Sequence, residues 1–161
     1  MTESCAIPQY LVTKYGPTPL QVTPDEPEYG EYLNWIAHAD ATLTFPQTVV
    51  LRYTKQEPGK ADAAAEDYGK WYIARLRMLD NALADGRTYL VANRFTVADI
   101  VITYALFLGT TLDLDDQYKP QTRAYMERMM ERPAWAQAQQ IEEESAEAFE
   151  EMLEKEAQSK L

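Results

Sequence analysis

The feature that most constrains the fold is the segment Phe95-Thr96-Val97-Ala98-Asp99-Ile100 and the apolar run that continues from it. Thr96 is placed as a helix N-cap, and Asp99 stands three residues later, where its carboxylate can accept a hydrogen bond from the N-cap amide. Phe95 and Ile100 occupy the two positions of a hydrophobic staple. Over residues 97–108, apolar side chains recur at helical spacing with few charges on any face. The sequence therefore predicts a central, buried helix that begins at Thr96.

Two long helices are predicted before this one. Apolar residues recur near helical spacing over residues 28–43, until Phe45-Pro46 should kink or interrupt the helix because proline lacks an amide donor. A second apolar face covers residues 68–83 and is stopped by Asp85-Gly86. We expect the first helix to be bent and the pair to form a helical hairpin. Residues 88–91 could form a brief strand, but no comparable partner strand exists, so a loop is favoured.

Prolines mark the starts of the last two predicted helices. Pro120 suits a first helical position, and this helix must end near Arg132 because Pro133 disfavours helical geometry in the residue before it. Pro133 can itself open the final helix, which we expect to pack on one side only and to fray beyond Lys155. Its apolar stripe consists of Trp135, Ala138, Ile141, Phe149 and Met152. Strand–helix–strand alternation is absent from the sequence, so the predicted fold class is all-α.

The beginning of the chain is predicted to form a short helix and a linker. Residues 4–15 read as a helix with Ser4 as its N-cap, and Gly16-Pro17 ends it. The next stretch, residues 16–27, contains four of the nine prolines, which is typical of a surface connection. The predicted division of the chain is residues 1–16, a linker of residues 17–27 and a helical domain of residues 28–161.

Composition limits the class of protein. With 161 residues and 46% hydrophobic content, the chain is long enough to bury one core. Its formal net charge of −11 argues against binding to nucleic acid or anionic membranes. No apolar run approaches the ~18 residues of a membrane span, and the single cysteine, Cys5, excludes an intrachain disulfide. We expect a cytoplasmic protein with no nucleic-acid and no membrane partner.

The charge is concentrated near the C-terminus. Residues 142–156 hold eight Glu and one Lys. No His, Cys or glycine turn stands at ligand spacing among them, so we interpret the run as a solvated helix face and predict no metal site.

Three stretches of the chain resemble glutathione S-transferases. Glu3-Ser4-Cys5-Ala6-Ile7, followed by Tyr10-Leu11 and Lys14-Tyr15-Gly16, is similar to the last helix of that family's thioredoxin-like N-terminal domain. Residues 89–100 are similar to the segment that opens the core helix of the family's C-terminal domain. Residues 125–135, with Arg132-Pro133-Ala134, are the third match. Because order and spacing agree over residues 3–140, the chain is identified as a member of the glutathione S-transferase family.

The resemblance implies a helical bundle of the glutathione S-transferase C-terminal domain type, preceded by a remnant of the thioredoxin-like domain in residues 1–16. It implies conjugation of glutathione to hydrophobic electrophiles in the complete protein, with glutathione as co-substrate and no cofactor. It also implies a homodimer formed through the two long helices after Glu28. Glu3 and Ser4 match the pair that holds the γ-glutamyl end of glutathione, although Ser4 could merely cap a helix.

The family's thiolate-stabilising Tyr, Ser or Cys has no counterpart in this sequence. A free thiol titrates near pH ~8.5, and only its deprotonated form attacks electrophiles, so this help is needed. We therefore expect no catalytic residue in the chain and most of the N-terminal domain to be missing from it, which would leave the chain alone inactive. The alternative is a non-catalytic helical module for protein interaction or dimerisation.

Aromatic residues on the bent helix and on the central helix are candidates for the cleft that holds the electrophile in the family, because aromatic walls suit hydrophobic ligands. The candidates are Tyr32, Trp35, His38, Tyr104 and Phe107. Aromatic stripes on helices are more often plain core, and that interpretation stays open for each of them. No nucleophile or carboxylate partner is identifiable for His38, so a packing or surface histidine is favoured over a general base.

Two further residues invite a catalytic interpretation that we do not favour. Cys5 in the first turn of a helix could be a reactive thiol, since the helix dipole lowers a thiol pKa, but a small buried side chain is the more common case. Asp99 is explained by its position at the start of the central helix.

Overall fold

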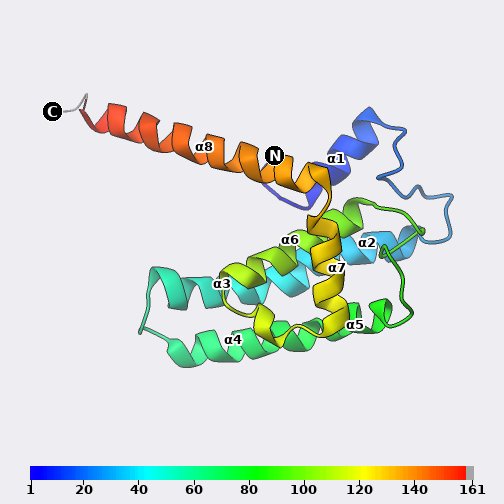
Figure 1. Cartoon of the computed structure of the whole chain (residues 1–161), viewed down its shortest axis with the longest axis horizontal. Helices are drawn as coiled ribbons and strands as arrows, with labels where there is room; N and C mark the ends of the chain where they lie inside the picture. Colours follow the sequence, from blue (N-terminus) through cyan, green and yellow to red (C-terminus); the bar gives the residue numbers. More distant parts are fainter. Residues whose placement is uncertain (159–161) are drawn as a thin grey trace. The chain divides into compact units, whose positions relative to one another are not determined.

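Residues 1–158 are described by a computed structural model, and they contain helices but no strand (Figure 1), which confirms the all-α fold class. The chain divides into two compact units, residues 1–126 and the residues from Glu127 onward. The helices of the first unit are α1 (Ala6–Tyr15), α2 (Tyr29–Ala37), α3 (Phe45–Leu51), α4 (Asp62–Arg75), α5 (Arg77–Leu83) and α6 (Val97–Thr111). α7 (Pro120–Met130) begins in the first unit and ends in the second.

The first long helix is irregular in its middle. The segment His38–Thr44 between α2 and α3 is π-helical, and a second π-helical segment, Arg52–Gln56, follows α3. Pro46 has no amide hydrogen to donate to the turn before it, so the α-helical ladder cannot run through this point unchanged. The helix is interrupted as expected, but the irregular segment precedes Phe45-Pro46. The reason is that the missing Pro46 amide would have donated to a carbonyl in the preceding turn.

The second long helix and the first form the predicted hairpin, in which α3 packs against α4 (Figure 1). Leu76 separates α4 from α5, and the predicted apolar face is buried at Tyr72, Leu76, Leu79 and Leu83. The chain then turns at Gly86, whose φ of 80° favours glycine. Residues 88–91 form no strand, as predicted.

α6 is the central helix of the first unit. Nine of its residues are buried, among them Ala98, Ile102, Ala105 and Leu106 with no exposed surface. Ile100 and Tyr104 are its exposed large hydrophobic residues. The predicted burial is therefore confirmed for most of the helix.

The start of α6 has the predicted capping box. The Thr96 side chain accepts a hydrogen bond from the amide of Ala98, and the Asp99 carboxylate accepts one from the Thr96 amide at 2.9 Å. Asp99 is fully buried and also accepts from the Leu90 amide at 3.0 Å and the Tyr125 hydroxyl at 2.9 Å. Burial raises the pKa of Asp99, and these hydrogen bonds offset part of the rise. One carboxylate thus joins the loop before α6, the helix start and α7.

The linker is irregular, as predicted, but it is more than a surface connection. Arg94 donates to the Pro19 carbonyl at 2.9 Å and the Gln21 carbonyl at 2.8 Å, and it forms an ion pair with Glu26 at 2.7 Å. The amide of Val97, at the start of α6, donates to the Leu20 carbonyl at 2.9 Å. Val22 is completely buried. These contacts bind the linker to the start of the central helix, which proline content alone could not predict.

The second unit contains the end of α7 and the long helix α8 (Pro133–Gln158), which opens at Pro133 as predicted. Within this unit, nothing covers most of the predicted apolar stripe of α8, because Ile141, Phe149 and Met152 are 45–57% exposed. Periodicity shows which face of the helix is apolar, not which neighbour covers it, and the one-sided packing of α8 stays a prediction. Residues 159–161 at the end of the stretch predicted to fray lie outside the described residues.

Candidate functional site

The start of α1 carries the two residues predicted to contact glutathione, Glu3 and Ser4. The helix begins at Ala6, and no side chain caps it, so the prediction that Ser4 is the N-cap is wrong. Its first turn is closed by the backbone, since the amides of Ala6 and Ile7 both donate to the Glu3 carbonyl at 3.1 Å. Glu3 and Ser4 are exposed. Both side chains are therefore open to a ligand.

Asp40, in the π-helical segment, influences the pKa of Cys5 at the start of α1. The sequence analysis did not identify this residue. Burial raises the pKa of the half-buried Cys5 thiol, and the negative charge of Asp40 raises it further, with a hydrogen bond to Ser4 working in the opposite direction. Burial and the nearby carboxylates thus disfavour the Cys5 thiolate, in line with the unreactive side chain that the sequence analysis favoured. The sequence signal that could have pointed to Asp40 is Pro46, six residues later, because Pro46 disrupts the α-helical ladder and π turns are frequent at functional sites.

The charges around the α1 start favour a cationic group. The Glu3 and Asp40 carboxylates both disfavour the Cys5 thiolate, so both lie within electrostatic reach of the same sulfur. Two carboxylates near an exposed hydroxyl and a helix N-terminus can pair with an ammonium group and accommodate a carboxylate beside it. An α-amino acid carries that combination of groups.

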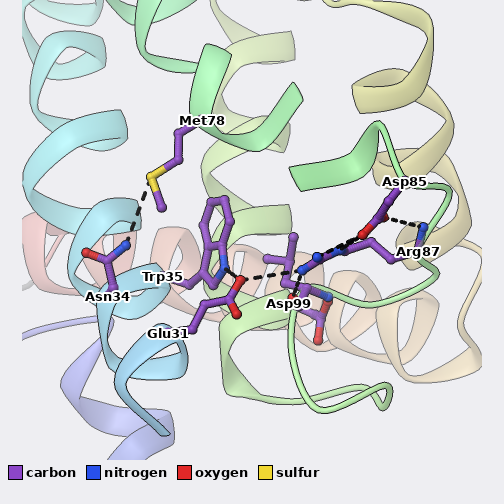
Figure 2. Close-up of polar contacts among 8 residues, drawn as sticks. Glu31, Asn34, Trp35, Met78, Asp85, Arg87 and Asp99 are labelled. Carbon is purple, nitrogen blue, oxygen red and sulfur yellow. Dashed lines mark hydrogen bonds and ion pairs between the residues drawn. The ribbon is translucent and has the colours of Figure 1, made fainter. Parts of the chain in front are cut away.

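Tyr32 and Trp35, predicted for the electrophile cleft, are core residues of the first unit, with 0% and 1% exposure. The indole of Trp35 donates to Glu31 at 3.3 Å, and Glu31 pairs with Arg87, which also pairs with Asp85 (Figure 2). Burial raises the pKa of Tyr32 to about 12, and its hydroxyl has no hydrogen-bond partner among the described residues. Neither ring lines an open cleft in the described residues.

His38 opens the π-helical segment and packs edge-on against Trp35, with ring centroids 5.8 Å apart. Burial lowers the pKa of His38, and a hydrogen bond to the Arg75 backbone opposes this. The buried Nε2 atom has no hydrogen-bond partner within the part of the chain that the structure describes. The lowered pKa favours the neutral imidazole at pH 7. These contacts describe a packing histidine.

The remaining two candidates lie on α6, and both are more exposed than Tyr32 and Trp35. Tyr104 is 43% exposed, and Phe107, one turn later, is half-buried. The five candidates therefore divide into a buried set on α2, an intermediate His38 and an outer set on α6, and their assignment to an electrophile cleft stays a prediction.

An open groove of about 630 Å³ lies elsewhere in the first unit, and none of the predicted site residues lines it. A Cβ added at Gly69 would come within 3.3 Å of Leu114, so glycine allows this side chain to pack closely against α4. The other lining residues are Val50, Tyr53, Thr54, Pro58, Asp62, Ala65, Glu66, Lys70, Leu112 and Gln117.

Residues 1–158 hold neither a cluster of metal-ligating side chains nor a helix suited to crossing a membrane. They contain no group of three or more His, Cys, Asp or Glu side chains arranged to hold a metal ion. Within the same residues, no helix combines the length and apolar character that crossing a membrane requires.

Comparison with known proteins identifies the helical domain. The family model for the glutathione S-transferase C-terminal domain matches residues 43–133, which is more than half of the chain. No curated protein sequence matches the chain significantly.

Several solved structures share the fold. The glutathione transferase URE2P8 of Phanerochaete chrysosporium, solved with oxidized glutathione, has a TM-score of 0.78 at 19% identity, covering 91% of this chain and 68% of its own. A glutathione transferase of Methylococcus capsulatus strain Bath has a TM-score of 0.77 at 25% identity, covering 88% and 68%. URE2P6 of Phanerochaete chrysosporium, in complex with oxidized glutathione, has a TM-score of 0.76 at 26% identity, covering 88% and 66%. This chain thus spans about two thirds of the length of each relative, and it belongs to the glutathione S-transferase C-terminal domain family.

Proposed function

We propose that this chain supplies the helical domain and part of the glutathione site of a transferase that conjugates glutathione to hydrophobic electrophiles. The observation that carries the proposal is the exposed Glu3-Ser4 pair beside the Asp40 charge. Glu3 and Asp40 would bind the α-amino group of the γ-glutamyl residue, and Ser4 would bind its α-carboxylate. Similar glutathione transferases solved with oxidized glutathione support the choice of ligand.

Residues 1–16 would be the last helix of a thioredoxin-like domain, followed by the linker and the helical domain. The outer surface of α1 supports this division, because Ile7, Tyr10, Leu11 and Tyr15 are 37–71% exposed. The remainder of such a domain would cover these side chains and supply the residue that stabilises the glutathione thiolate. Cys5 is unsuited to that task because its own pKa is raised. A reducing cytoplasm fits the single unpaired cysteine.

Calorimetric titration with glutathione tests this proposal. The chain as it stands should bind weakly, and the chain extended by any upstream coding sequence should bind at least tenfold more tightly and conjugate an aromatic electrophile. In the extended protein, Glu3→Gln and Asp40→Asn should each weaken binding, whereas Tyr53→Phe in the distant groove should not. Binding that is unaffected by Glu3→Gln would contradict the assigned site.

The second candidate, a homodimerisation module, rests on an exposed aromatic cluster formed by Phe45, Tyr68 and Trp71. Ring centroids in this cluster lie 5.2–6.1 Å apart, and Phe45 and Trp71 are 50% and 38% exposed. The guanidinium of Arg75 lies 5.5 Å from the Trp71 ring. Exposed Trp and Arg side chains are typical of the centre of a protein interface.

The charges around Trp71 fit a second copy of the chain. Asp67 and Arg75 are both exposed and lie four residues before and after Trp71, so all three share a face of α4. A twofold axis at Trp71 would run two copies of α4 antiparallel and place Asp67 opposite the partner's Arg75 on both sides. The face is therefore self-complementary in charge despite the net charge of −11.

A charge-swap series measured by sedimentation velocity tests the dimer. Asp67→Arg and Arg75→Asp should each raise the dimer dissociation constant at least tenfold, and the double variant should restore most of the affinity. Arg52→Asp, on an exposed residue outside the cluster, is the matched control. A parent chain that stays monomeric at high concentration, or a double variant as weak as the single ones, would exclude this interface.

A further inference from the structure

The second half of α8 is an exposed amphipathic surface. Every residue from 140 to 153 is exposed, including four large hydrophobic ones. These are Ile141 at 56%, Phe149 at 57%, Met152 at 45% and Leu153 at 47% exposure. With about 100° of rotation per residue, the four side chains fall within an arc of roughly 120° of the helix. We name this surface, defined by these four residues, the α8 stripe.

The surroundings of the α8 stripe are strongly acidic. Residues 142–156 hold eight Glu and one Lys, and Lys155 pairs with Glu151 at 3.1 Å. Glu142 lies within the arc of the stripe, and most of the other glutamates lie outside it, on the flanks and the opposite side. The stripe also lies beyond residues 43–133, the part matched by the family model.

The charge determines which partner can cover the stripe. Four large apolar side chains in water favour burial against another surface, at about 25 cal/mol per Å². A second copy of α8 would bring like charges together along both flanks, and nucleic acid or an anionic membrane would do the same. A cationic amphipathic helix would bury the stripe and pair its Lys or Arg residues with the flanking glutamates.

We propose that the α8 stripe is a docking surface for a basic amphipathic helix of a partner protein. From Ile141 to Leu153 the stripe extends about 18 Å along the helix axis, so a partner helix of about 12–15 residues covers it. This interaction does not involve glutathione and is independent of the function proposed above.

The test uses the full chain and three synthetic peptides of about 18 residues, a length that allows a helix to span the stripe. The first peptide is an amphipathic helix of leucine and lysine, the second has the same composition in scrambled order, and the third has glutamate in place of lysine. Fluorescence anisotropy should show that the first peptide binds at least tenfold more tightly than either control and that added salt weakens it. Equal binding of the scrambled peptide would mean attraction by charge alone and would overturn the proposal.

Variants of the stripe give the second readout. Phe149→Ser with Met152→Ser should weaken binding of the first peptide at least tenfold while circular dichroism of the chain stays unchanged. Ile7→Ser with Leu11→Ser removes exposed apolar surface from α1 and should leave binding unchanged. If the Phe149 and Met152 changes instead lower the melting temperature by several degrees, or abolish a dimer or vesicle binding, the stripe is covered in another way and the proposal is wrong.

Discussion

The starts of α6 and α1 show how differently two hydroxyl residues before a helix can behave. At α6, Thr96 caps the helix, and Asp99 at the third position returns a hydrogen bond to the Thr96 amide. At α1, Ser4 caps nothing, and the first turn of that helix contains no acidic residue. The α6 start is completely buried, whereas Ser4 is exposed.

The comparison shows that hydrogen bonds from other parts of the fold support a helix cap. Asp99 is held from outside its own helix by the Leu90 amide and the Tyr125 hydroxyl. Arg94 and the amide of Val97 then attach the linker to the same point. Ser4 has no such support from distant residues, and its exposed side chain forms a hydrogen bond with the neighbouring Cys5 thiol. Tertiary contacts rather than residue type thus give Thr96 and Asp99 their structural role, and the ligand role of Ser4 stays a proposal.

The largest effect is expected from Asp99→Ala. This change leaves the buried amides of Leu90 and Thr96 and the Tyr125 hydroxyl without their acceptor, so the free energy of unfolding should fall by about 3 kcal/mol or more. Chemical denaturation of parent and variant measures it. A loss below about 1 kcal/mol would mean that Asp99 does not join these elements.

Asp99→Asn adds a pH test with a defined sign. Because burial raises the pKa of Asp99, the folded chain binds more protons than the unfolded chain between the ordinary Asp pKa and the raised one. The contribution of Asp99 to stability therefore falls as pH rises through that window. The parent should gain stability relative to Asp99→Asn as pH is lowered toward about 4, and a gain in the opposite direction would contradict the burial argument.

Arg94→Met should have the next largest effect. It removes hydrogen bonds to two linker carbonyls and the ion pair with Glu26, and it should lower stability by about 1–2 kcal/mol. Hydrogen exchange should increase selectively at the amides of residues 20–26. Arg94→Lys keeps the charge but not the forked geometry, so it is the matched control and should recover only part of the loss.

Thr96→Ala should cost about 1 kcal/mol, because it removes the N-cap hydroxyl but leaves Asp99 in place. Thermal melts followed by circular dichroism are sufficient to detect it. Coincident melts of variant and parent would show that the α6 start is held by Asp99 alone.

Ser4→Ala should change stability by less than about 0.5 kcal/mol, since Ser4 caps no helix. Paired with Thr96→Ala in the same melts, it measures the contrast between the two helix starts directly. A destabilisation equal to that of Thr96→Ala would mean that Ser4 caps α1 after all.

Much of the fold could be predicted from local patterns. The α6 start, the proline starts of α7 and α8 and the hairpin of the two long helices are all as predicted. Each depends on residues close in sequence, on periodicity or on the missing amide of proline. Apart from the wrong N-cap at Ser4, the failures concern contacts between distant residues, such as Gln21 and Arg94, which lie 73 residues apart in the sequence.

The candidate site was less predictable than the fold. Glu3 and Ser4 came from resemblance, and their exposure is compatible with a ligand role. Asp40 was missed because its electrostatic effect on the Cys5 pKa acts between residues that lie 35 positions apart in the sequence. Tyr32 and Trp35 were predicted as cleft residues, yet both are buried. Helical periodicity shows that they lie on an apolar face, but it does not show whether that face borders a cavity or the core.

By itself, the sequence determined the helical class, the places where most helices begin and end, and the family, since these follow from backbone chemistry and from residue order. Only the tertiary structure decided that Asp99 is a buried junction, that Arg94 binds the linker and that the α8 stripe is exposed. The physical reason is that burial, hydrogen-bond partnership and pKa depend on which residues the fold brings within a few ångströms, and chain order does not specify that distance.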